Sequence, residues 1–488
     1  MEGAAITQAR AEERLVYESD WLGSRPCFYN LRTGRASPRI NDVIDFADLE
    51  FDPAGLNDFL DFGFCVFERT PVRDVRLLRH SSRLLRGPGG LRVEYLDDPT
   101  REWFERSSTV DEVVEASSAA VNTAAERATG DVVVPTSGGL DSRFINLLLA
   151  DRPRVRAFTY GLSDRPERSD EVVKAAELSR LLGFRWETVE LGRFHRHLDE
   201  WDDLFGPAMH AHGMYQMEFY REVAARVAPG SVVISGSCGD TLAGGDDRIV
   251  SELPILDRPD DMLAWFRWAP MYADSAASLF PTDRDHWRSQ IEQDPRLRTE
   301  FRPRVVFLIR QQALFYSYLA AVPEAYGLPC ATPFVEAEVA RALLTLPWEQ
   351  RNRRIWQRDL FRRRGLDLEF ADLPADWRNT LNLRALRRVP VPPLDVGLLR
   401  EIVKPEYVRW VNRNVGRVGL PWEAFVRLGW TRGFRRATAA LRAAGIDDQR
   451  SPAYFAYLTL RPLEALLRRR DRACAGSGEP EPAHATEA

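Results

Sequence analysis

The sequence predicts an α/β fold built on a doubly wound parallel sheet, and two observations indicate it. Short apolar runs rich in β-branched residues have the length and composition of buried strands, at 131–135, 155–160, 186–191 and 231–235. Stretches with helical periodicity alternate with them, at 141–150, 170–182 and 214–228. Because this alternation is typical of βαβ units, ligands are expected beyond the carboxyl ends of the strands.

The regions on either side of this pattern differ from it. From about residue 300 the chain is helical, with helices expected at 301–319 and 335–346 and arginine-rich amphipathic stretches up to Arg472. The last residues are small, polar and proline-containing, which predicts a disordered tail. We therefore divide the chain into a β-rich N-terminal region, a sheet domain, a helical C-terminal region and a tail, at 1–105, 106–385, 386–475 and 476–488.

The first glycine-rich loop follows the strand at 131–135 and reads Ser137-Gly-Gly-Leu-Asp-Ser142. Its two glycines let successive N–H groups turn toward one point, and its two serines add hydroxyl donors. A helix that starts at about Asp141 directs its positive end to the same place. The loop therefore predicts a phosphate or pyrophosphate cradle. It is not a Walker-type loop, since the only lysines, Lys174 and Lys404, do not follow a glycine.

A second loop of the same kind follows the strand at 231–235 and contains Asp240. Magnesium takes one or two protein carboxylates and otherwise binds phosphate oxygens and water. Asp141 and Asp240, each at a strand end, therefore predict one shared magnesium site. Either aspartate alone would more often be a helix cap or turn residue.

Together the two loops resemble those of the asparagine synthetase family. Ser137-Gly-Gly-Leu-Asp-Ser142 resembles the family's pyrophosphatase loop, and the segment 235–245 is similar to its Ser-Gly-Glu-Gly-Ala-Asp-Glu-Leu-Phe-Gly-Gly. Weaker similarity extends over roughly residues 55 to 365, where 59–64 and 70–78 look like the closing strands of the family's glutaminase domain. The resemblance implies a PP-loop ATP pyrophosphatase fold after a truncated N-terminal region.

The resemblance also implies an activity. Enzymes of this family bind ATP and Mg²⁺, adenylate a carboxylate with release of pyrophosphate, and form an amide when a nitrogen nucleophile displaces AMP. By position, the residues that would hold the pyrophosphate are Ser137, Gly138, Gly139 and Ser142, and those that would bind magnesium are Asp141 and Asp240. The positions that would line the adenosine are Pro135, Tyr160, Ser235 and Gly236.

Three departures from the family pattern bear on the nitrogen chemistry. Glu2 stands where glutamine-hydrolysing members have a cysteine, so the N-terminal region resembles an inactive glutaminase remnant. Ser237 replaces a glutamate that acts as a base toward the attacking nitrogen. The family's later lysine is missing, and Arg354 or Arg358 is expected to replace it, although arginine binds phosphate with a different geometry.

Two histidine pairs are further candidates. Neither His195–His197 nor His210–His212 matches a zinc-binding spacing. His210 and His212 lie where the family places substrate-binding residues, so they are candidates for the acceptor pocket, with a solvated loop as the alternative.

Composition narrows the function classes. A formal net charge of −5 gives no electrostatic case for nucleic acid, and no apolar run is expected to span a membrane. The five scattered cysteines fit a reduced cytoplasmic protein.

We therefore predict an ATP-dependent amide-forming ligase that acts on a small carboxylate and a nitrogen nucleophile, with ammonia or amine supplied from elsewhere. The alternatives are an ammonia-dependent asparagine synthase that uses aspartate and a catalytically impaired nucleotide-binding relic. A sulfur-inserting pyrophosphatase that acts on RNA would want a paired cysteine and a basic surface, and both are lacking.

Overall fold

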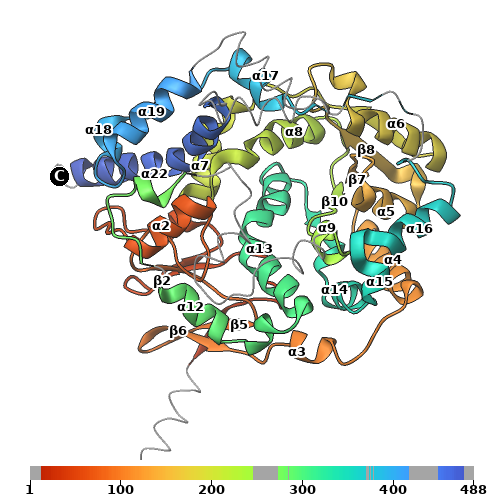
Figure 1. The fold of residues 1–488 in the computed structure, drawn as a ribbon, viewed down its shortest axis with the longest axis horizontal. Helices are drawn as coiled ribbons and strands as arrows, with labels where there is room; N and C mark the ends of the chain where they lie inside the picture. Colours follow the sequence, from red (N-terminus) through yellow and green to blue (C-terminus); the bar gives the residue numbers. More distant parts are fainter. Residues whose placement is uncertain are drawn as a thin grey trace, which may run out of the picture.

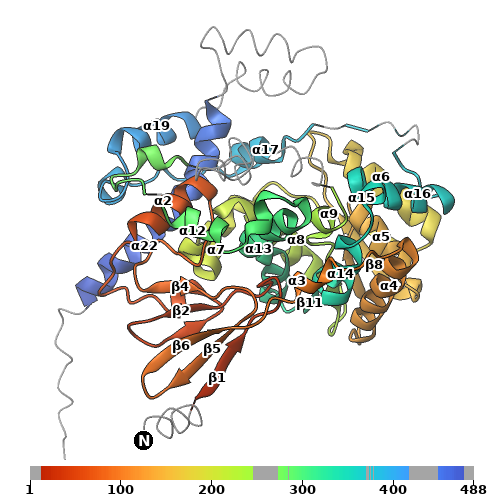
Figure 2. The ribbon, with the colours of Figure 1, turned by 60° about the horizontal axis from the view of Figure 1, so that its bottom comes forward.

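The computed structural model describes residues 13–245, 273–283, 285–369, 373, 375–376, 378–416 and 449–476. In Figure 1 the parallel sheet and its helices form the right-hand side, the C-terminal helices α18 (Val396–Leu399), α19 (Pro405–Val415) and α22 (Arg450–Gly476) lie on the left, and helix α13 (Phe301–Ala325) runs between them. The N-terminal strands lie below α13 in Figure 2. From residue 477 onward, the predicted tail lies outside the described residues.

A five-stranded parallel sheet forms the core of the right-hand side, which confirms the predicted fold class. Its spatial order is β11-β10-β7-β8-β9, and every neighbouring pair is parallel. The strands are β7 (Val132–Pro135), β8 (Val155–Thr159), β9 (Arg185–Thr188), β10 (Val232–Ile234) and β11 (Cys330–Ala331). The valines of β7 and β10 are buried, as expected of strands covered on both faces. The short β11 is missing from the sequence prediction.

The order of the strands creates a switch point between β7 and β10. The chain adds β8 and β9 on one side of β7 and then returns to add β10 and β11 on the other. Adjacent strand ends from which the chain departs in opposite directions leave a crevice at the carboxyl edge of the sheet. Both glycine-rich loops leave the sheet at this point.

Five helices pack on or beside the sheet: α4 (Val110–Glu126), α5 (Leu140–Leu148), α6 (Asp170–Leu182), α8 (Tyr215–Ala224) and α14 (Ala337–Leu344). Helix α4 begins with a capping box in which Thr109 and Glu112 bond each other's backbone N–H groups. The Lys174 side chain of α6 is only 13% exposed and pairs with Asp170 at 2.8 Å.

The C-terminal half is helical, as predicted. Its helices are α15 (Trp348–Arg351), α16 (Ile355–Arg363), α17 (Leu381–Arg388), α18 (Val396–Leu399), α19 (Pro405–Val415) and α22 (Arg450–Gly476). The remaining described helices are α2 (Pro53–Phe62), α3 (Thr100–Trp103), α7 (Leu198–Phe205), α9 (Gly239–Leu242) and α12 (Asp285–Glu292).

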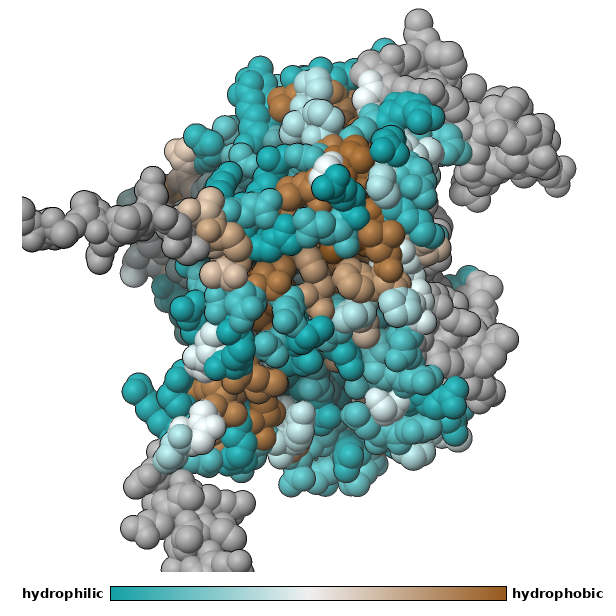
Figure 3. All heavy atoms as spheres, turned by 90° about the vertical axis from the view of Figure 1, so that its left-hand side faces the viewer, coloured by the Kyte–Doolittle hydropathy of each residue, from teal (hydrophilic) through white to brown (hydrophobic). Residues whose placement is uncertain are grey.

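On the left-hand face of Figure 1, hydrophobic residues gather in a band across a mostly hydrophilic surface (Figure 3).

Helix α13 bears on the expectation that no apolar run spans a membrane. By length and composition alone it is apolar enough to cross one. However, 61% of its most apolar stretch is buried inside the protein, where it packs against α8 and β11. Its burial and packing are therefore those of a core helix in a folded domain.

The N-terminal region contains two three-stranded antiparallel sheets. Their orders are β1-β5-β6 and β3-β2-β4, with strands β1 (Arg14–Glu18), β2 (Phe28–Asn30), β3 (Ala36–Ser37), β4 (Val75–Leu77), β5 (Ser82–Gly87) and β6 (Gly90–Tyr95). The expectation of a strand at 59–64 is wrong, because residues 59–62 belong to α2. Asp52 caps this helix by accepting a bond from Gly55 N, and Pro53 occupies its first turn. The boundaries of the predicted domains stay predictions.

Candidate active site

The two glycine-rich loops converge at the carboxyl edge of the sheet. Asp141 lies in the first turn of α5, after β7, and Asp240 lies in α9, after β10. The approach is close enough to require glycine, since a Cβ added at Gly239 would lie 2.8 Å from the Asp141 carboxyl carbon. A Cβ at Gly236 would lie 3.2 Å from the Asp141 Cβ. The two carboxylates are therefore brought together by backbone packing.

Arg354 lies between the two carboxylates. Its Nη1 donates to Asp240 Oδ1 at 2.7 Å, and its Nη2 donates to Asp141 Oδ1. The arginine side chain is only 8% exposed, whereas those of Asp141 and Asp240 are 24% and 61% exposed. One buried cation thus joins the two loops.

The backbone that presents Arg354 is strained. Arg353 and Arg354 have φ values of +54° and +60°, a region that side chains other than glycine rarely adopt. Gln357, which is fully buried, accepts from Arg354 Nε at 2.9 Å and donates to the carbonyl of Leu140 at 3.3 Å. Trp356 donates to the carbonyl of Ala243 at 3.1 Å, so the segment is fixed to both loops. Strain held in this way is typical of functional sites.

Close packing and internal hydrogen bonds fix the backbone of the predicted phosphate loop, and its role stays a prediction. Gly138 has φ +67°, and a Cβ there would lie 2.4 Å from the Cβ of Lys174. Ser142 Oγ accepts from Ser137 N at 3.3 Å, and Ser137 Oγ accepts from Gly139 N at 3.3 Å. These serines therefore help to hold the loop in shape before any ligand is present.

Arg143 supports this loop and was missed by the sequence analysis. Its guanidinium is fully buried, donates to the carbonyl of Gly138 at 2.7 Å and forms two bonds of 2.9 Å with the Glu369 carboxylate. A charged residue inside an amphipathic helix ordinarily indicates a solvated position, so the sequence carries no signal for this role.

The residues expected to line the adenosine also lie at adjacent strand ends. Pro135 ends β7, Tyr160 follows β8, and Ser235 and Gly236 follow β10. Gln216 of α8 donates to the Tyr160 hydroxyl at 3.3 Å, and the ring of Tyr215 lies 5.8 Å from that of Tyr160. The four residues therefore lie at the same edge of the sheet as the two aspartates.

The comparison with known families can now be added to this geometry. A family model described as asparagine synthase matches residues 112–367, which is more than half of the chain and includes Asp141, Asp240 and Arg354. The chain belongs to the asparagine synthase family. No curated protein matches the sequence. Membership of the asparagine synthase family indicates a ligase-type enzyme of the amide-forming class, and the resemblance found in the two loops is confirmed.

The choice between the two candidate arginines is clear in geometric terms. Arg358 is exposed, and its Nε donates to the backbone carbonyl of Arg353 at 3.2 Å. Arg354 contacts both carboxylates, whereas Arg358 contacts neither. Their catalytic roles stay predictions.

The electrostatics at Asp141 reflect its crowded position. Burial raises the pKa of Asp141 to about 6, and the nearby charge of Asp240 adds to this, although the Arg354 guanidinium opposes the shift. Two carboxylates that share one cation form a donor set that a divalent oxygen-binding ion also favours. The residues present therefore fit a magnesium ion at this place.

The histidines divide into two different arrangements. His195 contacts the Val389 carbonyl at 2.6 Å and the Tyr454 hydroxyl at 2.7 Å, whereas His197 contacts Glu200 at 2.6 Å. The rings of His210 and His212 stack with centroids 5.7 Å apart, and that of His212 lies 6.0 Å from the Tyr215 ring. Burial lowers the pKa of His212 to about 4. Within the described part of the chain, no cluster of three or more metal-binding side chains is present.

Proposed function

We propose that this protein is an ATP-dependent ligase that adenylates a carboxylate with release of pyrophosphate and then forms an amide with release of AMP. One observation carries the proposal: Asp141 and Asp240 come from two strand-end loops at the switch point of the sheet and share one cation. Family membership supports the same class of reaction.

The reaction consists of two displacements. An oxygen of the substrate carboxylate attacks the α-phosphorus of ATP, and the bond from that phosphorus to the pyrophosphate oxygen breaks. The nitrogen nucleophile then attacks the acyl carbon, loses a proton, and the bond to the AMP oxygen breaks. In the proposed site Ser137, Gly138, Gly139 and Ser142 bind the leaving pyrophosphate, and oriented N–H groups stabilise the charge that develops there.

The remaining candidate residues have complementary tasks. Pro135, Tyr160, Ser235 and Gly236 border the adenosine. Asp141 and Asp240 would hold magnesium, which when bound supplies charge neutralisation at the phosphate oxygens. Arg354 supplies a fixed positive charge at the same point, in place of the family's lysine.

The nitrogen source in this proposal is an amine or ammonia that reaches the site directly. Glu2 stands where a glutamine-hydrolysing relative has its nucleophilic cysteine, and residues 1–12 lie outside the described structure. Ser237 is buried and offers no carboxylate as a base. The substrates are therefore proposed to be a small carboxylate and an amine or ammonia from a separate supplier, in the cytoplasm.

Pyrophosphate release in the presence of ATP, Mg²⁺ and panels of carboxylates and amines tests the reaction. Asp141→Ala and Asp240→Ala should each lower the rate at least about 1000-fold, since each removes a ligand for the charge on the phosphates. Asp359→Ala is the matched control, because Asp359 pairs with Arg362 on α16 and, among the described residues, with no other cation. Activity of both site variants equal to that of the wild type would refute the site and the proposed chemistry.

Labelled glutamine tests the nitrogen source. Purified protein should release no labelled glutamate while it turns over ATP with an added amine. Steady glutamate release that persists in Cys27→Ala and Cys65→Ala variants would show that glutamine is used after all.

A further inference from the structure

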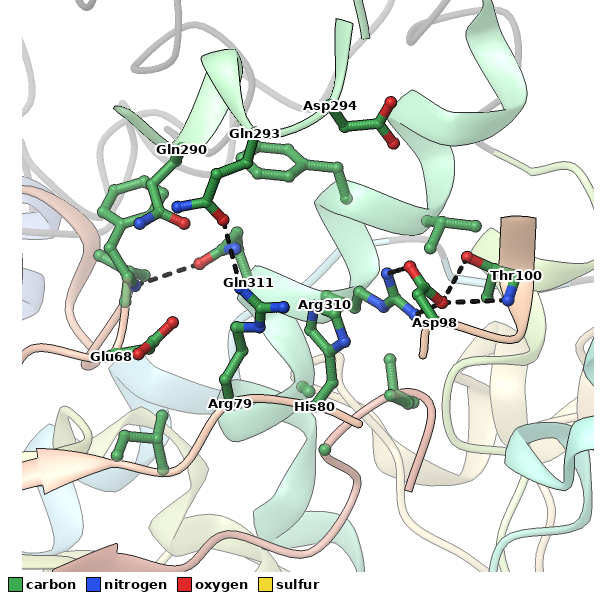
Figure 4. Close-up of a pocket in the computed structure, with 18 of the residues that line it drawn as sticks. Glu68, Arg79, His80, Asp98, Thr100, Gln290, Gln293, Asp294, Arg310 and Gln311 are labelled. Carbon is green, nitrogen blue, oxygen red and sulfur yellow. Dashed lines mark hydrogen bonds and ion pairs between the residues drawn. The ribbon is translucent and has the colours of Figure 1, made fainter. Parts of the chain in front are cut away.

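A second pocket lies between the N-terminal sheets and helices α12 and α13. Its volume is about 220 Å³, and its polar wall includes Glu68, Arg79, His80, Arg310 and Gln311 (Figure 4). None of the candidate nucleotide-site residues lines it. The volume is sufficient for one small molecule rather than for a nucleotide.

Backbone strain distinguishes this pocket from the rest of the surface. In the described residues, positive φ outside glycine occurs at six positions: Phe67, Glu68, Ser81, Cys238, Arg353 and Arg354. The last three belong to the candidate active site. The first three line the second pocket or directly follow a residue that does. Because strain of this kind persists where surrounding structure imposes it and clusters at binding sites, its concentration here points to a ligand.

Two opposite charges face the pocket without pairing. Among the described residues, Glu68 and Arg79 form no ion pair with each other or with any other side chain, although both point into the same space in Figure 4. The Arg79 Nε and the His80 Nδ1 are buried and have no hydrogen-bond partner. Burial raises the pKa of Glu68, against the opposing charge of Arg79. Leaving such groups unpaired costs free energy that a bound ligand would recover.

Tyr95 holds the two charges in place. Its ring lies under the Arg79 guanidinium at 4.6 Å, and its hydroxyl donates to the Glu68 carboxylate at 3.4 Å. Gln293 accepts from Arg79 Nη1 at 3.2 Å, which fixes the arginine from the other side. The arrangement therefore keeps a cation and an anion apart at fixed positions.

Two other pairs of ionic groups in the pocket are already satisfied. Arg310 and Asp98 form two hydrogen bonds of 2.7 Å, and Asp294 pairs with Arg296 at 2.7 Å. Gln311 accepts from the backbone N–H of Phe67 at 3.1 Å. Asp97 and Arg101 also line the pocket but are exposed to solvent, so Glu68 and Arg79 are the partly buried charges that a ligand can pair with.

We propose that this pocket binds a small zwitterion with the chemistry of a free amino acid, whose carboxylate contacts Arg79 and whose ammonium group contacts Glu68. A simple anion would be repelled by the Glu68 carboxylate, and a simple cation by the Arg79 guanidinium. A ligand with both charges pairs with each group and completes the hydrogen bonds of Arg79 and His80. This site is independent of the proposed ligase reaction.

The pocket is connected to the region near the candidate active site. The carbonyl of Gly63 accepts from His210 N at 2.7 Å, and Cys65 N donates to the carbonyl of Ala208 at 2.9 Å. The segment 63–68 is thus hydrogen-bonded to the loop that contains the stacked rings of His210 and His212. Helix α13 contacts both the pocket and α9, which contains Asp240.

Calorimetry with the twenty standard amino acids tests the proposal on the wild-type protein. At least one free amino acid should bind, and its N-acetyl and carboxamide derivatives should bind at least about tenfold more weakly, because each lacks one of the two charges. The same titration with Asp141→Ala separates this pocket from the ligase site, since binding here should persist in that variant.

Variants assign the bound amino acid to the pocket. Glu68→Gln and Arg79→Gln should each weaken binding about tenfold or more. The matched controls Glu94→Gln and Arg83→Gln change the same charges on β6 and β5, outside the pocket, and should bind as the wild type does. The proposal is overturned if no free amino acid binds, if the blocked derivatives bind equally well, or if both pocket variants bind normally.

Discussion

The two strained sites use opposite charges in different ways. In the candidate active site Arg354 contacts both Asp141 and Asp240, so cation and anions neutralise one another in the absence of ligand. In the second pocket Tyr95 contacts both Arg79 and Glu68, which form no ion pair with each other. Charges in contact hold two loops together, whereas charges that are not paired can each pair with a ligand. The same residue types thus stabilise loop packing in one place and are proposed to bind a ligand in the other.

The largest effect on the free energy of unfolding is expected when a paired charge is removed from the wall of the second pocket. Asp98→Asn leaves the Arg310 guanidinium, only 8% exposed, without its anion. The free energy of unfolding should fall by about 3 kcal/mol, as is usual when one partner of a buried pair is removed. Denaturant titration at pH 7 measures it. Glu18→Gln, which breaks an exposed pair with Arg83, should cost no more than about 1 kcal/mol.

The Asp98–Arg310 pair also makes the free energy of unfolding depend on pH, and the pKa shift of Asp98 sets the direction of that dependence. Burial opposes ionisation of Asp98, but the hydrogen bonds from Arg310 outweigh it and lower the pKa of Asp98 well below its usual range. A lowered folded-state pKa stabilises the protein above the unfolded-state pKa of about 4, and this contribution is lost as the pH falls further. The stability difference between wild type and Asp98→Asn should therefore shrink below pH 4. A difference that grows on acidification would contradict the assignment.

The next effect is a loss of catalytic rate when the cation that pairs with the two active-site aspartates is removed. Arg354→Gln should lower kcat/KM for pyrophosphate release about 100-fold, because a fixed positive charge next to the phosphates is lost. It should also tighten binding of Mg²⁺ in the absence of ATP, since the guanidinium no longer competes for the carboxylates. Calorimetric titration with MgCl₂ measures this without turnover.

Arg358→Gln is the matched control for Arg354→Gln. Arg358 lies one helical turn further along, is exposed and does not contact either aspartate. It should leave both the rate and Mg²⁺ binding unchanged. If Arg358→Gln lowered the rate as much as Arg354→Gln does, the assignment of the active-site cation to Arg354 would be wrong.

The smallest effect should follow from adding an unpaired carboxylate to the active site. If the ancestral chemistry is latent, Ser237→Glu should raise ammonia-dependent amide formation severalfold, because a glutamate can accept the proton that a serine hydroxyl cannot near neutral pH. Ser237→Gln controls for size, and product formation from ammonium chloride is the measurement. Efficient asparagine synthesis from aspartate and ammonium by the wild type at pH 7 would instead establish the ordinary reaction.

The central strands β7 and β10 were predictable because they are short, apolar and rich in valine, and because a glycine-rich loop follows each of them. The fifth strand was missed since Cys330–Ala331 is too short to show any periodicity. Residues 59–62 were misread because the strand was expected only from the family resemblance, while the helix start at Asp52 and Pro53 lies earlier in the chain. Local patterns therefore identify long elements better than two-residue strands.

The sites were predictable only to the extent that their residues lie in motifs. Asp141 and Asp240 stand in recognisable loops, but the choice of Arg354 over Arg358 depends on two left-handed residues that have no sequence signature. Arg143 and Gln357 are polar residues in helices, where burial cannot be inferred from periodicity. The second pocket joins Glu68 to Gln311 across more than 240 positions, a pairing that only the tertiary fold creates.

The buried position of α13 has a consequence for how the chain tolerates loss of its first hundred residues. Trp21 donates to the Val335 carbonyl at 2.8 Å and accepts through its own carbonyl from Arg310 on α13, so the N-terminal region shields a helix that is apolar enough for a bilayer. Deleting that region would expose apolar surface of α13 to water, and such surfaces drive aggregation. The N-terminal region thereby acts as an intramolecular cover for this helix.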